Sequence, residues 1–423
     1  MHILILGSGG REHSIAWAVK QNPKCTKLTC APGNAGMQKI GSCINLDIND
    51  GNKIRTWSEE NNVDLVIIGP EEPLSHGVSD ILNLAGILTF APSMEASKLE
   101  SSKHFTKQIC NISGAPTAKF KHFKDQKTAL KFLNDTEFPL VIKADGLAAG
   151  KGVIIASTHA EAVTAINDMF GGQYGDAGAE VIIEEFMDGE EVSLFVLCDD
   201  TDILSIGSAQ DHKRAYDNDA GPNTGGMGAY SPAPILTAEI EKKAISKIIE
   251  PCLKQMKKLG TPYKGVLYAG LMIKDEEPKL VEFNARLGDP ECQVLMMRLG
   301  AQILDLILAT CENRLVEARV AWADDHAITI VIAAKGYPNA YDKGFVISET
   351  NNIVQDSNNM LFHAGTKLEN EKVISTGGRV LNATTRGSNL KEAKMRAYEM
   401  VKNVNWKDGF YRSDIGWRAF RII

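Results

Sequence analysis

The sequence is short of the features that mark secreted, membrane-spanning and zinc-binding proteins. Its 423 residues include only eight cysteines, without a Cys-x-x-Cys pair or a Cys/His spacing typical of zinc sites. Scattered cysteines are typical of reduced, buried thiols, so we expect a cytoplasmic protein. The apolar run Ile3–Leu6 is too short for a signal peptide, and no uninterrupted apolar stretch approaches the roughly 20 residues of a membrane span.

A surplus of positive charge is also lacking. The 46 Lys and Arg residues against 53 Asp and Glu residues give a net charge of −7. This balance excludes a general electrostatic footprint for nucleic acid or an anionic membrane. We expect small-molecule partners and, independently of the charge balance, a monomer. Local basic sites for small anions stay open. The hydrophobic share of 44% is typical of a folded protein, and the length suggests about three domains.

Strands and helices alternate over residues 1–92, which predicts a parallel sheet with ligand-binding loops at the carboxyl ends of its strands. Further on, the pattern predicts helices, an antiparallel pair of strands and a long irregular stretch. The helices are expected at His159–Phe170, Thr237–Leu259 and Val294–Cys311, the strand pair at Tyr268–Ile273 and Lys279–Phe283, and the irregular stretch at Gln210–Pro234.

Two glycine-rich loops are candidates for phosphate binding. Gly7–Gly10 follows the first strand and opens a helix, but Glu12 stands where a dinucleotide fingerprint needs a small residue. A dehydrogenase is therefore disfavoured, while a simple phosphate site or a purely structural turn stays open. The second loop, Lys143–Val153, lacks the spacing and the Ser/Thr of a P-loop and joins two strands. It could fold over a triphosphate, or be a surface hairpin.

Two carboxylate groups could serve a nucleotide site. Glu282, Asn284 and Arg286 alternate along one strand face, where oxygen ligands suit Mg²⁺ and a guanidinium could stabilise a transition state. A solvated polar face is the alternative, although the acids of Gly288–Glu291 weaken it. The second group, Glu184–Glu191, could hold ribose and adenine, yet acidic loops are usually just solvated.

Taken in order, these stretches resemble the ATP-grasp superfamily and, within it, the family of phosphoribosylamine–glycine ligases. The resemblance covers essentially the whole chain. It is carried by GSGGREH (7–13), GPEEPL (69–74), SKHFTK (102–107), residues 143–153, QDHKRAYDNDAGPNTGGMGAYSP (210–232), EFNARLGDPE (282–291), FHAGT (362–366) and GGRVL (377–381). The segment at 210–232 is the most specific to these ligases.

The resemblance implies an α/β and α+β multidomain fold. An N-terminal Rossmann-like domain would span residues 1–102 and an ATP-grasp domain residues 103–325, with a mobile lid at about 120–190. A small C-terminal α+β domain would follow at 326–423.

The resemblance also implies roles for individual residues. ATP would contact Lys103, Lys143, Gly146, Gly150, Lys151, Gly152, Glu184, Phe186, Met187 and Glu191. The other substrates would contact Gly9, Gly10, Pro70, Glu71, Asp211, Lys213, Asn223, Thr224, Gly225, Gly226 and Asp289. Lys143 and Arg286 would be catalytic, and Glu282 and Asn284 would bind Mg²⁺ or Mn²⁺. Alternatively, Lys213 and Arg214 could be structural partners of Asp217 or Asp219.

The activity implied is the ATP-dependent joining of glycine to 5-phosphoribosylamine through glycyl phosphate, the second step of purine biosynthesis. Another ATP-grasp enzyme, such as a carboxylase or an aminoimidazole-ribonucleotide ligase, is one rival. A non-catalytic nucleotide-binding regulator is the other, but it need not keep Glu282, Asn284 and Arg286 together.

Overall fold

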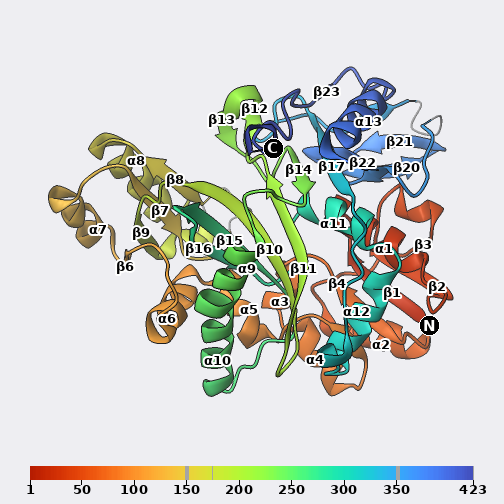
Figure 1. Ribbon diagram of the computed structural model, residues 1–423, viewed down its shortest axis with the longest axis horizontal. Helices are drawn as coiled ribbons and strands as arrows, with labels where there is room; N and C mark the ends of the chain where they lie inside the picture. The colour runs from red at the N-terminus through yellow and green to blue at the C-terminus, as the bar shows by residue number, and fades with distance from the viewer. Residues whose placement is uncertain (148–151, 174, 349–352, 423) are drawn as a thin grey trace.

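A computed structural model describes residues 1–147, 152–173, 175–348 and 353–422 (Figure 1). The first 101 residues build a five-stranded parallel sheet whose strands are almost wholly apolar, because helices cover both faces. In spatial order the strands are β3 (Ser42–Cys43), β2 (Lys27–Pro32), β1 (His2–Gly7), β4 (Leu65–Ile68) and β5 (Leu88–Phe90). The helices are α1 (Gly10–Lys20), α2 (Gly51–Glu60), α3 (Glu72–Ser75), α4 (Val78–Leu84) and α5 (Met94–Ser101).

A four-stranded antiparallel sheet forms a second unit, which Figure 1 shows projecting away from the N-terminal sheet. Its strands are β6 (Phe120–Phe123), β9 (Val181–Glu185), β7 (Leu140–Ala144) and β8 (Val153–Ala156), packed under α7 (Gln126–Phe132) and α8 (His159–Phe170). The unit has a hydrophobic cluster of its own, which includes Ile142, Ile166 and Val181. The glycine-rich loop therefore joins two antiparallel strands, as predicted.

The largest sheet has nine strands and runs from the centre of the chain into its C-terminal part. In order, these are β16 (Glu277–Asn284), β15 (Gly265–Lys274), β10 (Glu190–Cys198), β11 (Ile203–Asp211), β14 (Gly228–Ser231), β17 (His326–Ala334), β22 (Arg379–Gly387) and β19 (Asn359–His363), while β23 (Gly409–Phe410) pairs with β17. Because β14 pairs with β17, this sheet contains strands from both sides of the domain boundary predicted at residues 325 and 326. The fold class predicted from the sequence is confirmed.

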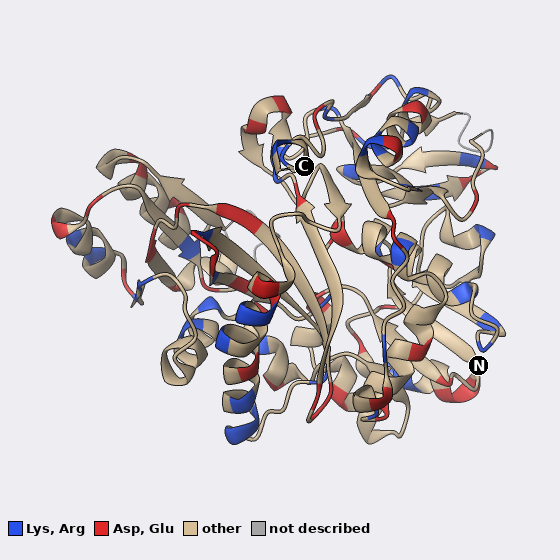
Figure 2. Cartoon of the chain, viewed as in Figure 1, with Lys and Arg blue, Asp and Glu red and all other residues tan. Residues whose placement is uncertain are grey.

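The remaining elements surround this sheet. The helices are α6 (Lys103–Ser113), α9 (Ala238–Ala244), α10 (Glu250–Lys258), α11 (Glu291–Leu299), α12 (Gln302–Cys311), α13 (Leu390–Lys402) and α14 (Ala419–Ile422). The small strands are β12 (Arg214–Tyr216) with β13 (Ala220–Asn223), and β18 (Val346–Ile347) with β21 (Lys372–Ser375) and β20 (Thr366–Glu369). Figure 2 shows Lys and Arg interspersed with Asp and Glu along the helices, while strands such as β1, β4, β14 and β17 carry neither.

Three local predictions need correction. The helix predicted at Val294–Cys311 is two helices, α11 and α12, and the direction of the chain bends by 104° between them, around Gly300. The long helix at Thr237–Leu259 contains a π-helical turn at Ile245–Ile249. The turn ends two residues before Pro251, whose ring would clash with the carbonyl of residue 247 in a regular helix. The irregular stretch at Gln210–Pro234 contains the short strands β12, β13 and β14.

Within the described residues, no single helix has the length and apolarity needed to cross a bilayer. The bent pair α11 and α12 passes that test when taken together. Most of its side chains lie in the main hydrophobic core.

Candidate active site

A cavity of ≈ 850 Å³ lies where the four-stranded unit, the central sheet and the N-terminal loops meet. Stretches that are far apart in the sequence line it together. Of the predicted site residues, the lining includes Gly9, Pro70, Glu71, Lys103, Lys143, Gly146, Gly152, Glu184, Phe186, Met187, Glu191, Asp211, Lys213, Asn223, Thr224, Gly225, Glu282, Asn284, Arg286 and Asp289. The second glycine loop thus shares one cavity with the carboxylate strand.

Four predicted residues are not described as lining it. Gly150 and Lys151 lie outside the described residues. Gly10 is buried in the first turn of α1, where a Cβ would stand 2.5 Å from the side-chain nitrogens of both Asn382 and Gln293. Gly226 has φ +113, and a Cβ there would stand 2.4 Å from Pro290 Cδ. These two glycines allow close packing around the cavity, and direct substrate contact by them stays a prediction.

Two buried lysines share one buried glutamate at the wall of the cavity. Lys143 Nζ lies 3.0 Å and Lys107 Nζ 3.1 Å from Glu184 Oε2, and all three side chains are at most 5% exposed. Lys143, at the end of β7, also lies 3.4 Å from the carbonyl oxygen of Val281 on β16. One carboxylate against two ammonium groups leaves excess positive charge, which suits a bound polyphosphate.

The glycine loop is anchored at its described ends. The Ala144 amide donates to the Gly152 carbonyl at 2.9 Å, and Lys103 Nζ donates to the Gly146 carbonyl at 3.0 Å. Asp145 accepts hydrogen bonds from Ser102 Oγ at 3.2 Å and from the His104 amide at 3.1 Å. The loop is therefore tied to the N-terminus of α6, which carries Lys103 and Lys107.

The cation-binding candidates lie on β16. Burial opposes ionisation of Glu282, but the charges of Lys213, Lys143 and Lys103 outweigh it, so the pKa of Glu282 is lowered. An ionised carboxylate with the nearby amide oxygen of Asn284 fits a hard cation that takes its other ligands from phosphate and water. The facing strand β15 places Gly270 opposite Glu282 and Tyr268 opposite Asn284, so it adds no acid.

Arg286 is held between two acids from the N-terminal part of the chain. Its guanidinium lies 3.3 Å from Glu71 and 2.9 Å from Glu100, while the Ala285 amide donates to Glu100 at 2.7 Å. Burial opposes the charge on Arg286, but Glu100 and Glu71 more than offset it and raise its pKa. Arg286 is therefore a fixed cation, and the Pro70–Glu71 loop is linked to the end of β16.

Lys213 forms an ion pair with Glu191, the residue predicted to hold ribose. The expected partners Asp217 and Asp219 belong elsewhere, because Asp219 pairs with Arg412 and Arg418 of the C-terminal segment. Arg214 donates to the Gly221 carbonyl at 2.7 Å across the β12–β13 hairpin. The alternative prediction, that Lys213 and Arg214 pair with Asp217 or Asp219, is therefore wrong: their partners are Glu191 and the Gly221 carbonyl.

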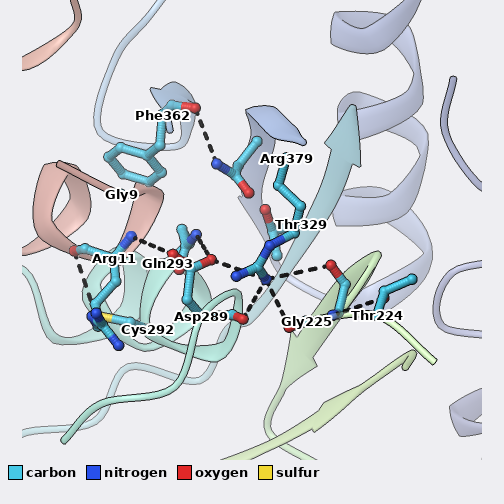
Figure 3. A network of polar contacts seen from close by, with 12 residues as sticks. Gly9, Arg11, Thr224, Gly225, Asp289, Cys292, Gln293, Thr329, Phe362 and Arg379 are labelled. Atoms are coloured by element: carbon cyan, nitrogen blue, oxygen red, sulfur yellow. Dashed lines mark hydrogen bonds and ion pairs between the residues drawn. The ribbon is translucent and has the colours of Figure 1, made fainter. Parts of the chain in front are cut away.

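A polar corner connects the N-terminal, central and C-terminal parts of the chain around Asp289 (Figure 3). Its carboxylate accepts from the Arg11 amide at 3.2 Å and from Gln293 Nε2 at 3.0 Å, and lies 3.4 Å from Arg379 Nη1. Arg379 also donates to the Gly225 carbonyl at 2.7 Å. The corner sets the distance between the first glycine loop and the 223–226 loop.

Next to this corner lies a second cavity of ≈ 410 Å³. It shares Ser8, Gly9, Asp289 and Arg379 with the main cavity. Its other lining residues come from the end of β2 and from the C-terminal part of the chain. These further lining residues are Pro32, Gly33, Ala364, Gly365, Thr366, Lys367 and Thr376. Glycines with Lys367 and Arg379 suit an anionic group.

Glu12 organises the first glycine loop. Its carboxylate accepts from the Gly9 amide at 2.6 Å. A Cβ at Gly7, Gly9 or Gly69 would lie within 2.7 Å of the Glu12 side chain. The carboxylate thus occupies the space between the loops that follow β1 and β4. The sequence showed this only indirectly, because Glu12 departs from the dinucleotide fingerprint.

Several lining residues were not predicted. They are mainly charged side chains from scattered positions: Arg11, Glu100, Lys107, Asp219, Glu291, Arg379 and Arg418. Arg11, Lys107, Asp219, Glu291 and Arg379 lie inside the motifs that carry the resemblance, so the motifs themselves were a signal. Glu100 and Arg418 lie outside them, and their partners Arg286 and Asp219 are distant in the sequence.

Comparison with known proteins decides the family. Three models of phosphoribosylglycinamide synthetase match: the N domain over residues 1–100, the ATP-grasp (A) domain over 101–292 and the C domain over 327–418. A phosphoribosylamine–glycine ligase of Brucella melitensis is 46% identical over 419 residues, which are 99% of this chain and 98% of the relative. The chain belongs to the phosphoribosylglycinamide synthetase family.

Other members of this family and of the wider fold agree. The chloroplastic phosphoribosylamine–glycine ligase of Arabidopsis thaliana is 48% identical and covers 97% of this chain and 79% of its own. The crystal structure of the Thermotoga maritima ligase matches with a TM-score of 0.86 at 30% identity, covering 98% of this chain and all of its own. A biotin carboxylase from Campylobacter jejuni, solved with an ATP analogue, has a TM-score of 0.75 at 15% identity over 97% of this chain and 92% of its own, and so shows the shared ATP-grasp fold.

Proposed function

We propose that this protein is an ATP-dependent ligase that joins glycine to 5-phosphoribosylamine, giving glycinamide ribonucleotide, ADP and phosphate. The observation that carries the proposal is the single cavity that collects the lysines, the carboxylate strand and the 210–232 segment. Full-length similarity to phosphoribosylamine–glycine ligases supports the choice of substrates. The reaction is the second step of purine biosynthesis.

The chemistry requires activation of glycine. A free carboxylate is a poor electrophile, because its charge repels nucleophiles and its leaving group is an oxide. Transfer of the γ-phosphoryl group to glycine gives glycyl phosphate, which has a good leaving group, and the amine then attacks its carbonyl carbon. Phosphoryl transfer of this kind depends mostly on positioning and charge stabilisation.

The ATP tail would lie between the glycine loop and β16. Lys143 and Lys103 would bind phosphate oxygens, with amides of the loop at Gly146–Gly152 above them. Phe186, Met187 and Glu191 would hold the nucleoside, and Glu184 would keep Lys143 and Lys107 charged and in position. Glu282 and Asn284 would hold Mg²⁺ or Mn²⁺, which would offset negative charge on the phosphoryl groups, and Arg286 would stabilise negative charge beside them.

The sugar phosphate would bind near the polar corner. Gly9, the Pro70–Glu71 loop, Asp289 and the 223–226 loop surround that end of the cavity, and Arg379 provides a cation there. The four-stranded unit at about 120–190 would act as a lid that keeps water from the acyl phosphate. The boundaries at 102 and 325, the monomeric state and the cytoplasmic location stay predictions.

The decisive test is ADP release by the purified protein. We expect release to require ATP, glycine, 5-phosphoribosylamine and a divalent cation together, with glycinamide ribonucleotide formed in equal amount. Release with bicarbonate or another acceptor in place of glycine would assign a different ATP-grasp activity. ATP binding without any turnover would favour the alternative of a non-catalytic nucleotide-binding regulator.

A further inference from the structure

Glu291 is a buried carboxyl group in the cavity that the proposed chemistry has not used. It is the first residue of α11, it is 4% exposed, and it lines the cavity with Arg286, Gly288 and Asp289. A Cβ on residue 288 would lie 2.5 Å from Glu291 Oε2, so only glycine leaves room for the carboxyl group. The side chain is thus fitted tightly at the point where β16 ends and α11 begins.

Most acids of the cavity are committed to cations. Glu71 and Glu100 hold Arg286, Glu184 holds two lysines, and Glu191 holds Lys213. Glu291 differs, because its described hydrogen bond comes from a hydroxyl group: Ser193 Oγ lies 3.4 Å from Oε1. Ser193 also lies 3.1 Å from the hydroxyl of Tyr268, so Glu291 ends a short chain of neutral groups.

The charged and titratable groups that face Glu291 come from four strands or their ends. They are Asp211 at the end of β11, Lys213 after it, Tyr268 on β15, Arg286 after β16 and Arg379 on β22. Burial and the neighbouring Asp211 raise the pKa of Glu291 to about 7, although Lys213 and Arg286 oppose them. A carboxyl group with such a pKa can take up and release a proton near neutral pH.

Amide formation leaves one proton to be removed. The amine nitrogen forms a bond to the carbonyl carbon of glycyl phosphate, the carbon–oxygen bond to phosphate breaks, and phosphate leaves with the electron pair. The nitrogen then carries one proton more than an amide. Lys143, Lys103 and Arg286 are cations and cannot accept it, and Glu282 is held ionised among lysines at the phosphate end.

We propose that Glu291 is the general base that accepts this proton from the attacking amine. The inference rests on the proposed function and adds a catalytic residue to it. The proton moves from nitrogen to a carboxylate oxygen of Glu291 as the amide forms, and is released to solvent after the products leave. Gly288 and Ser193 position the carboxyl group for this step.

The test separates the two halves of the reaction. Hydroxylamine traps an acyl phosphate as a hydroxamate without 5-phosphoribosylamine, so glycine-dependent ADP release with hydroxylamine reports the first half alone. Glu291→Gln keeps the shape and burial of the side chain but cannot act as a base. Glu312→Gln, at an exposed acid paired with Arg314, is the matched control, and Glu291→Asp tests partial rescue.

We expect Glu291→Gln to lower kcat for ligation by about 10²-fold or more, the usual contribution of a general base. Hydroxamate formation and the KM for glycine should stay close to those of the unchanged protein. The unchanged protein should lose kcat/KM for 5-phosphoribosylamine as the pH falls below about 7, and Glu291→Gln should lack this limb. Glu291→Asp should recover part of the rate.

Two results would overturn the inference. Ligation unaffected by Glu291→Gln would remove any role, and an equal fall of both halves with a raised KM for glycine would make Glu291 a binder of the glycine ammonium group. The pH limb is measured on the unchanged protein, so it decides even if the variant fails to fold. If the unchanged protein releases no ADP with glycine and 5-phosphoribosylamine together, the proposed function itself fails, which is a distinct outcome.

Discussion

At the scale of single residues, the cavity depends on side chains whose charge is fixed by one or two specific neighbours. Glu184 between Lys143 and Lys107 is the clearest case, because burying any one of the three alone would be costly. Arg286 between Glu71 and Glu100 repeats the arrangement with the signs reversed. Because the central charge of each group keeps a second partner, replacing one of the two outer members should affect catalysis more than folding.

Lys143→Ala should reduce ligase turnover by about 10²-fold or more, since it removes one preorganised cation from the phosphate site. The protein should still fold, because Lys107 continues to neutralise Glu184. ADP release measures the first effect and thermal unfolding the second. Lys254→Ala, at an exposed lysine paired with Glu250, is the control, and near-normal turnover in Lys143→Ala would remove Lys143 from the mechanism.

Glu282→Ala should shift the Mg²⁺ dependence of turnover to higher concentration. The shift should be at least the roughly 10–100-fold that loss of a supporting contact costs at metal sites. Glu277→Ala on the same strand is the control, because Glu277 is exposed and pairs with Lys243 and Lys247. An Mg²⁺ titration that is the same in Glu282→Ala and the unchanged protein would place the cation elsewhere.

At the scale of elements, the break between α11 and α12 has two effects. It leaves Glu291 at the cavity, and it lets both helices contribute side chains to the hydrophobic core. Gly300 has φ +55 and ψ −144, a conformation that residues with a side chain rarely adopt. Both helices pack against α1, and α12 also packs against β5 of the N-terminal part. The turn lets α11 begin at the cavity while α12 continues along β5.

Gly300→Ala should lower the free energy of unfolding by about 1–3 kcal/mol, the usual cost of a strained backbone conformation. A Cβ there would meet no atom within 4 Å, so the loss should reflect backbone strain alone. Urea unfolding at neutral pH measures it. Ala301→Ser, at the next residue with φ −57, should change stability by less than about 0.5 kcal/mol, and equal stability of the two variants would rule out strain at Gly300.

The elements also show how far the sequence could lead. Strands such as β1 and β4 are continuous apolar runs and were predictable, because both faces of a parallel sheet are buried. The bend at Gly300 was missed, since apolar periodicity continues through it and a single glycine is tolerated in many helices. The strands β12, β13 and β14 were missed because each has at most four residues. A strand that short shows too little alternation of apolar and polar residues to be predicted from the sequence.

The same division holds for the candidate site. Lys143, Glu282 and Asn284 belong to local patterns of charge and spacing, so their meeting in one cavity could be predicted. Glu100 and Arg418 could not be, because each matters only through a partner brought near by folding.

At the scale of the whole molecule, the C-terminal segment holds the β12–β13 hairpin over the cavity. Arg412, which is 1% exposed, pairs with Asp414 at 2.8 Å and Asp219 at 3.0 Å, and Arg418 pairs with Asp219 at 2.7 Å. The Asn218 amide donates to Asp414 at 2.9 Å. The segment 412–418, directly before α14, and the β12–β13 hairpin are thus one charged assembly.

This assembly predicts an acid-sensitive contribution to stability. Burial opposes ionisation of Asp414, but hydrogen bonds from Arg412 and Asn218 outweigh it and lower its pKa to about 2. A lowered pKa means that the ionised form stabilises the folded state above the ordinary value of 3.8, and that this contribution is lost as the pH falls toward about 2.

Asp414→Asn should therefore lower the free energy of unfolding at pH 7 and make it less dependent on pH between about 4 and 2. Urea unfolding across this range, compared with the unchanged protein, measures both effects. Asp305→Asn, at an exposed acid paired with Lys24, should keep the full pH dependence. Parallel curves for Asp414→Asn and the unchanged protein would contradict the prediction.

The spread of the cavity walls along the chain, from Gly7 to Arg418, has a consequence for synthesis. A ribosome must complete the chain as far as Arg418 before all walls of this cavity exist. Nascent chains interrupted earlier would lack the guanidinium groups that secure the hairpin, so their cavity would stay incomplete while they wait to be finished or degraded.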